Sequence, residues 1–124
     1  MPNKILIVED NPHTREILKT QVQALTYEVI EAESGEEGLK RALSDAPNLI
    51  IMDLGLPGMN GIETTAKLKR DPKISHIPVV AYTAWRAEDY REKAEDAGMG
   101  AYLTKPAPRQ VLQEVIQRFL QTNA

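Results

Sequence analysis

Asn48-Leu49-Ile50-Ile51-Met52-Asp53 decides how this chain folds, because four consecutive apolar residues lead directly into a carboxylate. Ala46-Pro47 precedes the stretch and a Gly/Pro-rich segment, residues 54–58, follows it. A short apolar run between such breaks indicates a strand buried on both faces, as in parallel sheets. Ligands bind beyond the carboxyl ends of the strands in open parallel sheets, and Asp53 lies at such an end. The ordinary alternative is that Asp53 only ends the strand or caps the next turn.

The size and composition of the chain are those of one globular domain. It has 124 residues, 42% of them hydrophobic and 27% charged, with a net charge of −3 and no cysteine. Such a domain needs no disulfide or metal to hold its core. The charge gives no reason to expect nucleic acid, which binds a clustered basic face. The first apolar run, residues 5–8, is too short for a signal peptide or a membrane span, so we expect a cytoplasmic protein with no membrane partner.

Strand-like and helix-like segments alternate along the whole chain. We expect strands at residues 4–8, 27–32, 48–53, 77–82 and 101–104. Three helices are expected to begin at Pro12, at Ser34 and after Asn60, and a fourth is expected over residues 85–98. A fifth is expected in the last segment, where apolar residues recur at 3.6 spacing from 111 to 120. The predicted buried faces of these helices include Ile17, Leu43 and Val111. Strict alternation predicts right-handed crossovers and a parallel sheet with helices on both faces.

Four of the five expected strands lead into residues that carry chemistry. Glu9 and Asp10 follow the first strand, Asp53 ends the third, Thr83 ends the fourth, and Lys105 follows the fifth. If the first, third, fourth and fifth strands are neighbours, these side chains meet at one edge of the sheet. The alternative is a set of unrelated loop residues.

Three carboxylates held close together raise one another's pKa unless a cation compensates. Mg²⁺ suits such a place because it takes oxygen ligands and often binds through one or two carboxylates, waters and a phosphate. A carboxylate beside the ion can attack phosphorus and form an aspartyl phosphate. Lys105 would then offset the developing charge, and Thr83 would hydrogen-bond a phosphoryl oxygen.

In this order and spacing, the residues resemble the motifs of the receiver domains of two-component response regulators over essentially the whole chain. The likeness rests on the acidic pair after residues 5–8, on Asp53 with the loop at 54–61, on Thr83-Ala84 and on Lys105-Pro106. It implies a flavodoxin-like, doubly wound α/β fold with five helices and a five-stranded parallel sheet in the order 2-1-3-4-5. Because the chain ends within a few residues of the last expected helix, we expect one receiver domain over residues 1–124 with no output domain, a stand-alone response regulator.

The resemblance implies that Asp53 accepts a phosphoryl group from a histidine kinase or phosphotransfer protein in a Mg²⁺-dependent reaction. Asp10, Asp53 and the Gly55 carbonyl would ligate the ion, with Glu9 acting through water. Catalysis would be limited to the protein's own phosphorylation and dephosphorylation, so the protein would not be an enzyme in the usual sense. Its output would be a change in protein–protein contacts.

The resemblance also assigns a switch. Thr83 and Lys105 would contact the phosphoryl group, and Tyr102 would change rotamer on activation. A half-buried strand tyrosine is the plain alternative for Tyr102. The bond between Lys105 and Pro106 is expected to be cis. A downstream partner is expected on the face formed by the fourth helix, the fifth strand and the fifth helix.

Three positions depart from what the family usually has. Asn60 stands where the family often has an aspartate, which is expected to affect only the local turn. Gly55 leaves no side chain two residues beyond Asp53, and Trp85 places a large aromatic ring two residues beyond Thr83. Both flank the predicted site, so we expect them to tune the lifetime of the phosphoryl group. Trp85 could instead anchor the packing of the polar fourth helix.

Other functions remain open from the residues alone. A haloacid-dehalogenase-type phosphatase also uses a strand-end aspartate with Mg²⁺, but it typically needs a second aspartate where this chain has Gly55. A flavodoxin-like electron carrier would need a Ser/Thr/Gly-rich phosphate loop where this chain has Glu9-Asp10-Asn11. A pseudo-receiver binds partners without phosphorylation, but it usually lacks an acidic residue or the lysine, and none is missing here.

Overall fold

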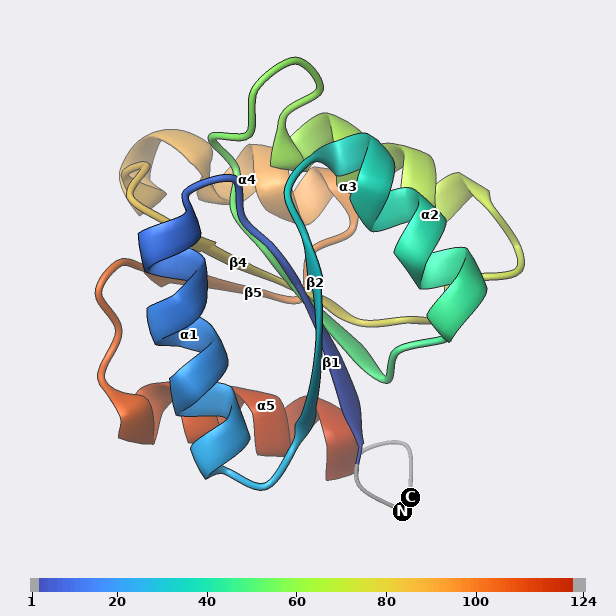
Figure 1. Cartoon of the computed structure of the whole chain (residues 1–124). Helices are drawn as coiled ribbons and strands as arrows, with labels where there is room; N and C mark the ends of the chain where they lie inside the picture. Colours follow the sequence, from blue (N-terminus) through green and yellow to red (C-terminus); the bar gives the residue numbers. More distant parts are fainter. Residues whose placement is uncertain (1–2, 122–124) are drawn as a thin grey trace.

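The computed structural model describes residues 3–121, in which five strands alternate with five helices and form a single parallel sheet (Figure 1). The strand order is β2-β1-β3-β4-β5, so the predicted fold class is confirmed. In chain order the elements are β1 (Lys4–Val8), α1 (Pro12–Ala24), β2 (Glu28–Ala32), α2 (Gly35–Asp45), β3 (Leu49–Met52), α3 (Gly61–Arg70), β4 (Val79–Thr83), α4 (Ala87–Ala97), β5 (Ala101–Thr104) and α5 (Arg109–Gln121).

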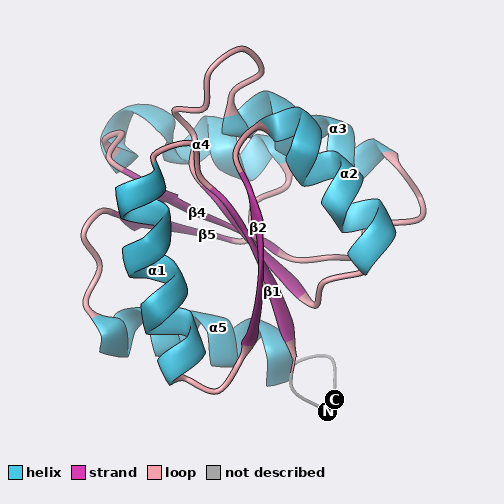
Figure 2. Cartoon of the chain, in the orientation of Figure 1, coloured by secondary structure: helices cyan, strands magenta, loops and turns pink. Residues whose placement is uncertain are grey.

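Helices cover both faces of the sheet, with α1 and α5 on one side and α2, α3 and α4 on the other (Figure 2). Neighbouring strand residues point to opposite faces, so Ile50 packs in the core under α2, α3 and α4, whereas Ile51 packs against α1 and α5. All four residues of β3 are buried. Burial on both faces explains why this strand is a continuous apolar run rather than an alternating one.

The register brings the carboxyl ends of the strands close to one level. Val8 pairs with Met52, so β1 and β3 end side by side, and Met52 pairs with Ala81, so β4 runs two residues further to Thr83. Thr83 of β4 pairs with Thr104 of β5. The residues that follow these ends therefore lie along one edge of the sheet.

Local signals place the starts of α1 and α3 where the sequence predicts them. The Asn11 side chain accepts hydrogen bonds from the amides of the first turn of α1, and Pro12 is the first residue of that helix. Asn60 and Glu63 form a capping box at the start of α3. These caps fix how the chain leaves the ends of β1 and β3, where the site lies.

Two element starts differ from the prediction by two residues. β4 runs from Val79 to Thr83, two residues later at its start, and α4 begins at Ala87 rather than at Trp85. The main chain of Trp85 is bound outside the helix: its amide donates to Thr83 Oγ1 and its carbonyl oxygen accepts from the Tyr102 hydroxyl. The extended conformation of Arg86 then separates Trp85 from the first turn of α4.

Three of the residues predicted to face the core are exposed. Ile17, Leu43 and Val111 are 50%, 49% and 37% exposed, whereas Leu18 and Leu112 beside them are buried. Helical periodicity shows which residues share a stripe, but adjacent stripe residues differ by about 100° around the axis, and only the inner one reaches the sheet. Among residues 3–121, no helix combines the length and the apolar character needed to cross a membrane.

Candidate functional site

The first two residues of the site continue the strand ladder. The amide of Asp53 donates to the Val8 carbonyl oxygen at 3.0 Å, and the amide of Glu9 donates to the Ala32 carbonyl oxygen at 3.0 Å. Both residues thus leave the sheet from adjacent strands in a fixed orientation. Glu9 and Asp53 are only 3% and 8% exposed.

The predicted acidic cluster is present. Glu9, Asp10 and Asp53 each offer a carboxylate oxygen, and these oxygens all lie within 4.8 Å of one another. Asp10 is exposed, so the cluster is open to solvent on its side. Three carboxylate oxygens at this spacing suit a hard divalent cation that keeps some of its waters, as Mg²⁺ does.

Lys105 supplies the positive charge of the cluster. Its ammonium hydrogen-bonds Glu9 Oε1 and lies 3.3 Å from Asp53 Oδ2. Burial alone would lower the pKa of Lys105, but the bonds and charges of the two carboxylates outweigh burial and raise it. The pKa of Glu9 is also raised, mainly by burial and further by the charge of Asp53, despite the bond from Lys105. Lys105 thus contacts two of the three carboxylates, Glu9 and Asp53.

The residues around the phosphoacceptor candidate come from the β3–α3 loop and the β4–α4 loop. Asp53 Oδ1 accepts a hydrogen bond from the amide of Gly55 at 3.2 Å. A Cβ atom added to Gly55 would lie 3.1 Å from Nε1 of Trp85. The indole of Trp85 thus occupies the space that a side chain at position 55 would take, and it also packs against Tyr90, with ring centroids 4.6 Å apart.

A chain of hydrogen bonds links the end of β4 to β5. The Thr83 hydroxyl oxygen accepts from the amide of Trp85 at 3.2 Å, and the Tyr102 hydroxyl donates to the carbonyl oxygen of Trp85 at 2.8 Å. Thr83 is fully buried and Tyr102 is 9% exposed, so Tyr102 lies deeper than a half-buried strand residue. Burial, followed by the nearby Tyr90, raises the pKa of Tyr102. The Lys105–Pro106 peptide bond is cis.

Two residues reach the site that the sequence patterns did not single out. Tyr82 of β4 lies with its ring centroid 5.9 Å from the Lys105 ammonium. Arg15 of α1 donates a hydrogen bond to the main-chain carbonyl oxygen of Glu9. For Arg15, the only sequence signal is a basic residue one turn into the helix that follows the acidic pair, which is too common to be specific.

Comparison with known proteins identifies the family. A profile of the response regulator receiver domain matches residues 5–117. The chain belongs to this family. The receiver domain is 37% identical over 120 residues to the polar-differentiation response regulator DivK of Brucella anthropi, an alignment that covers 97% of this chain and 98% of DivK.

Solved receiver structures agree with this assignment. The receiver domain of a sensor histidine kinase from Pseudomonas aeruginosa is 30% identical to this chain, with a TM-score of 0.90. The match covers 98% of this chain and 99% of the Pseudomonas chain. The Pseudomonas structure has a magnesium ion coordinated in its active-site cleft. A putative response regulator from Chloroflexus aurantiacus is also 30% identical, with a TM-score of 0.93 and the same coverage. The protein is therefore a receiver domain of two-component phosphorelay signalling, and these findings do not favour the phosphatase, electron-carrier or pseudo-receiver alternatives.

Proposed function

We propose that this receiver domain accepts a phosphoryl group on Asp53 from a histidine kinase or phosphotransfer protein. The observation that carries the proposal is the position of Asp53: it is nearly buried at the end of the central strand, within reach of the Lys105 ammonium and beside two further carboxylates. A carboxylate in this setting faces both a cation and a place for a metal ion. It is the group in the cluster best placed to act as a nucleophile.

Asp10 and Asp53 would hold Mg²⁺ directly, with the Gly55 carbonyl as a third ligand and Glu9 acting through water. The oxygen spacing of the three carboxylates supports this set, and so does the magnesium ion in the Pseudomonas relative. When bound, the ion neutralises charge on the incoming phosphoryl oxygens. Because Lys105 already bonds the Glu9 carboxylate, a water-mediated role leaves that bond in place.

Phosphoryl transfer needs few reacting groups from the receiver domain. A carboxylate oxygen of Asp53 forms the new O–P bond while the P–N bond of the donor phosphohistidine breaks, and the bonding electrons return to the imidazole. Lys105 offsets the negative charge on the transferred group. The Thr83 hydroxyl accepts from Trp85 and so still has its own hydrogen to donate to a phosphoryl oxygen.

The signal would leave the site through Thr83, Trp85 and Tyr102. If Thr83 turns toward the phosphoryl group, its bond from the Trp85 amide changes, and the Trp85 carbonyl that holds the Tyr102 hydroxyl changes with it. A ligand shifts a two-state equilibrium only as far as it binds one state better, and the Thr83 contact supplies that difference. The downstream partner would dock on the face of α4, β5 and α5.

Gly55 and Trp85 would set how long the phosphoryl group persists. Hydrolysis requires a water lined up opposite the bridging oxygen of Asp53. Gly55 has no side chain to orient that water, and the indole of Trp85 fills the adjoining space. We therefore propose a comparatively long-lived aspartyl phosphate that is reset mainly by partner proteins.

Mass spectrometry after treatment with a small phosphodonor and Mg²⁺ tests the assignment. Wild type should gain one phosphoryl group, Asp53→Asn should gain none, and the exposed-site control Asp96→Asn should label like wild type. Equal labelling of wild type and Asp53→Asn would refute Asp53 as the acceptor. No labelling of wild type by phosphodonor or by any histidine kinase of the source organism would favour a receiver that works without phosphorylation.

A further inference from the structure

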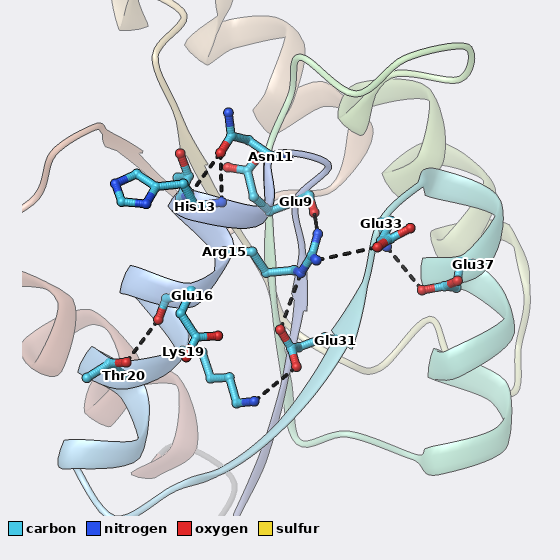
Figure 3. A network of polar contacts seen from close by, with 11 residues as sticks. Glu9, Asn11, His13, Arg15, Glu16, Lys19, Thr20, Glu31, Glu33 and Glu37 are labelled. Carbon is cyan, nitrogen blue, oxygen red and sulfur yellow. Dashed lines mark hydrogen bonds and ion pairs between the residues drawn. The ribbon is translucent and has the colours of Figure 1, made fainter.

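Arg15 of α1 makes three contacts, one to the end of β1 and two to β2 and the residue that follows it (Figure 3). Its Nη1 donates to the main-chain carbonyl oxygen of Glu9 at 2.9 Å. Its Nε lies 3.3 Å from Glu31 Oε1, and its Nη2 lies 3.4 Å from Glu33 Oε1. The side chain is only 13% exposed, so the guanidinium is held in place rather than free in solvent.

The positive charge of Arg15 is balanced where it lies. Glu31 also pairs with Lys19 at 3.2 Å, so two cations face the two carboxylates Glu31 and Glu33. The main chain of Glu33 is held in turn, because its amide donates to Glu37 Oε1 at 3.1 Å. The group therefore offers a hydrogen-bond donor to the Glu9 carbonyl without adding net positive charge beside the metal ligands.

The hydrogen bond from Arg15 to the Glu9 carbonyl oxygen also orients the peptide unit that joins Glu9 to Asp10. A peptide unit is planar, so the direction of the Glu9 carbonyl also sets the direction in which the chain enters Asp10. The other parts of Glu9 are already held: its amide by Ala32, and its carboxylate by Lys105 and by the Asn11 amide at 3.2 Å. The carbonyl is the remaining point at which this peptide could turn, and Arg15 binds it.

We propose that Arg15 is a positioning residue for the divalent-cation site: by holding the Glu9 carbonyl, it orients Asp10 and Glu9 toward Asp53. This inference rests on the proposed Mg²⁺ site. Groups that hold metal ligands from outside typically change metal affinity by about 10–100-fold when removed. Arg15 acts through a main-chain carbonyl rather than on a ligand atom, so the effect is expected at the lower end, about tenfold.

The sign of the effect separates positioning from charge. Arg15→Met removes a cation near three carboxylates, and Coulomb's law alone then predicts tighter binding of Mg²⁺. Positioning predicts weaker binding. Lys19→Met is the matched control, because it makes the same charge change and removes one of the two cations that pair with Glu31, as Arg15→Met does. Lys19 makes no bond to the Glu9 carbonyl, which Arg15 binds.

The experiment measures Mg²⁺ affinity of the full chain by titration, followed by the fluorescence of its single tryptophan, Trp85, which lies over Gly55. We expect Arg15→Met to bind about tenfold more weakly than wild type, and Lys19→Met to bind as wild type or slightly more tightly. Arg15→Lys keeps the charge but lacks the fork that reaches three acceptors, so it should also bind more weakly. Thermal melting in chelator confirms that each variant is folded.

The outcomes are distinct. Arg15→Met that binds Mg²⁺ as tightly as wild type, or more tightly, overturns the inference. If Arg15→Met does not fold, Arg15→Lys decides: binding equal to wild type overturns the inference, and weaker binding at unchanged charge supports it. If wild type binds no Mg²⁺, the proposed metal site is overturned and this inference with it. If wild type binds Mg²⁺ and the Arg15 variants bind it equally well, only this inference is overturned and the metal site stands.

Discussion

Replacing Gly61 by alanine is expected to destabilise the protein and to disturb the end of β3 that carries Asp53. Gly61 is the first residue of α3, and its amide donates to the Leu54 carbonyl oxygen at 2.9 Å. A Cβ atom added to Gly61 would lie 2.2 Å from the carbonyl oxygen of Asp53 and 2.9 Å from Cα of Leu54. Both are main-chain atoms, so no side-chain rotation can relieve the contact.

The cost follows from what must move. Inserting a methyl group into a packed region costs about 1–3 kcal/mol. The start of α3 must shift by roughly 1 Å to restore an ordinary contact, and that shift weakens the Gly61–Leu54 hydrogen bond, about 1 kcal/mol. Alanine gains at most about 1 kcal/mol over glycine in helix propensity. We therefore expect a net loss of about 2–3 kcal/mol and a Tm lower by about 10 °C.

Urea unfolding of wild type, Gly61→Ala and Gly58→Asn measures this difference. Gly58 has φ +72° and no heavy atom within 4 Å of an added Cβ, and asparagine tolerates that conformation, so the control should lose less than about 1 kcal/mol. Gly61→Ala should also slow labelling of Asp53 by a small phosphodonor at a temperature where it is folded. If Gly61→Ala proves as stable as Gly58→Asn, the steric reasoning is wrong.

Three further predictions concern the site. In metal-free protein, burial raises the pKa of Glu9 above its ordinary value of 4.5, so the free energy of unfolding should fall as pH rises from that value through the folded-state pKa. Glu9→Gln should remove this fall in urea titrations with chelator, and an unchanged pH profile would contradict it. Tyr102→Phe deletes the bond to the Trp85 carbonyl and should leave Asp53 labelling intact. It should, however, reduce the ratio of a partner's affinities for the phosphorylated and unphosphorylated forms, and a ratio equal to that of wild type would count against the switch. Trp85→Glu should shorten the half-life of the aspartyl phosphate about tenfold, or about 1.4 kcal/mol. Decay in excess Mg²⁺ measures this, and an unchanged half-life would mean that the ring only packs against α4.

The central strands β3 and β4 were predictable because their burial is extreme. Every residue of β3 and of β4 is buried. Each of these strands is therefore a largely apolar run in the sequence, and it can be recognised without knowing which strands lie beside it. The sheet order was not contained in that pattern: it came from the resemblance to receiver domains, and the structure confirms it. The inward faces of the helices were only partly predictable. Ile17 and Leu43 lie on the expected stripe, but they are half exposed because they lie outside the contact with the sheet. Periodicity does not show how wide that contact is.

That Glu9, Asp10, Asp53 and Lys105 follow the carboxyl ends of strands was determined by the sequence alone. That they meet also required the strand order, which the resemblance supplied and the structure confirms. Parallel strands end at the same edge, so residues that follow neighbouring strands must lie near one another. No knowledge of side-chain packing was needed for that step.

The contacts that tune the site were decided only by the tertiary structure. The indole of Trp85 fills the space at Gly55, the Tyr102 hydroxyl reaches the Trp85 carbonyl, and Arg15 reaches the Glu9 carbonyl. A hydrogen bond forms only when its atoms come within about 3 Å of each other, and the angle at which each helix or loop packs on the sheet decides that distance. Sequence patterns report which face of an element is buried, but they carry no information on that angle.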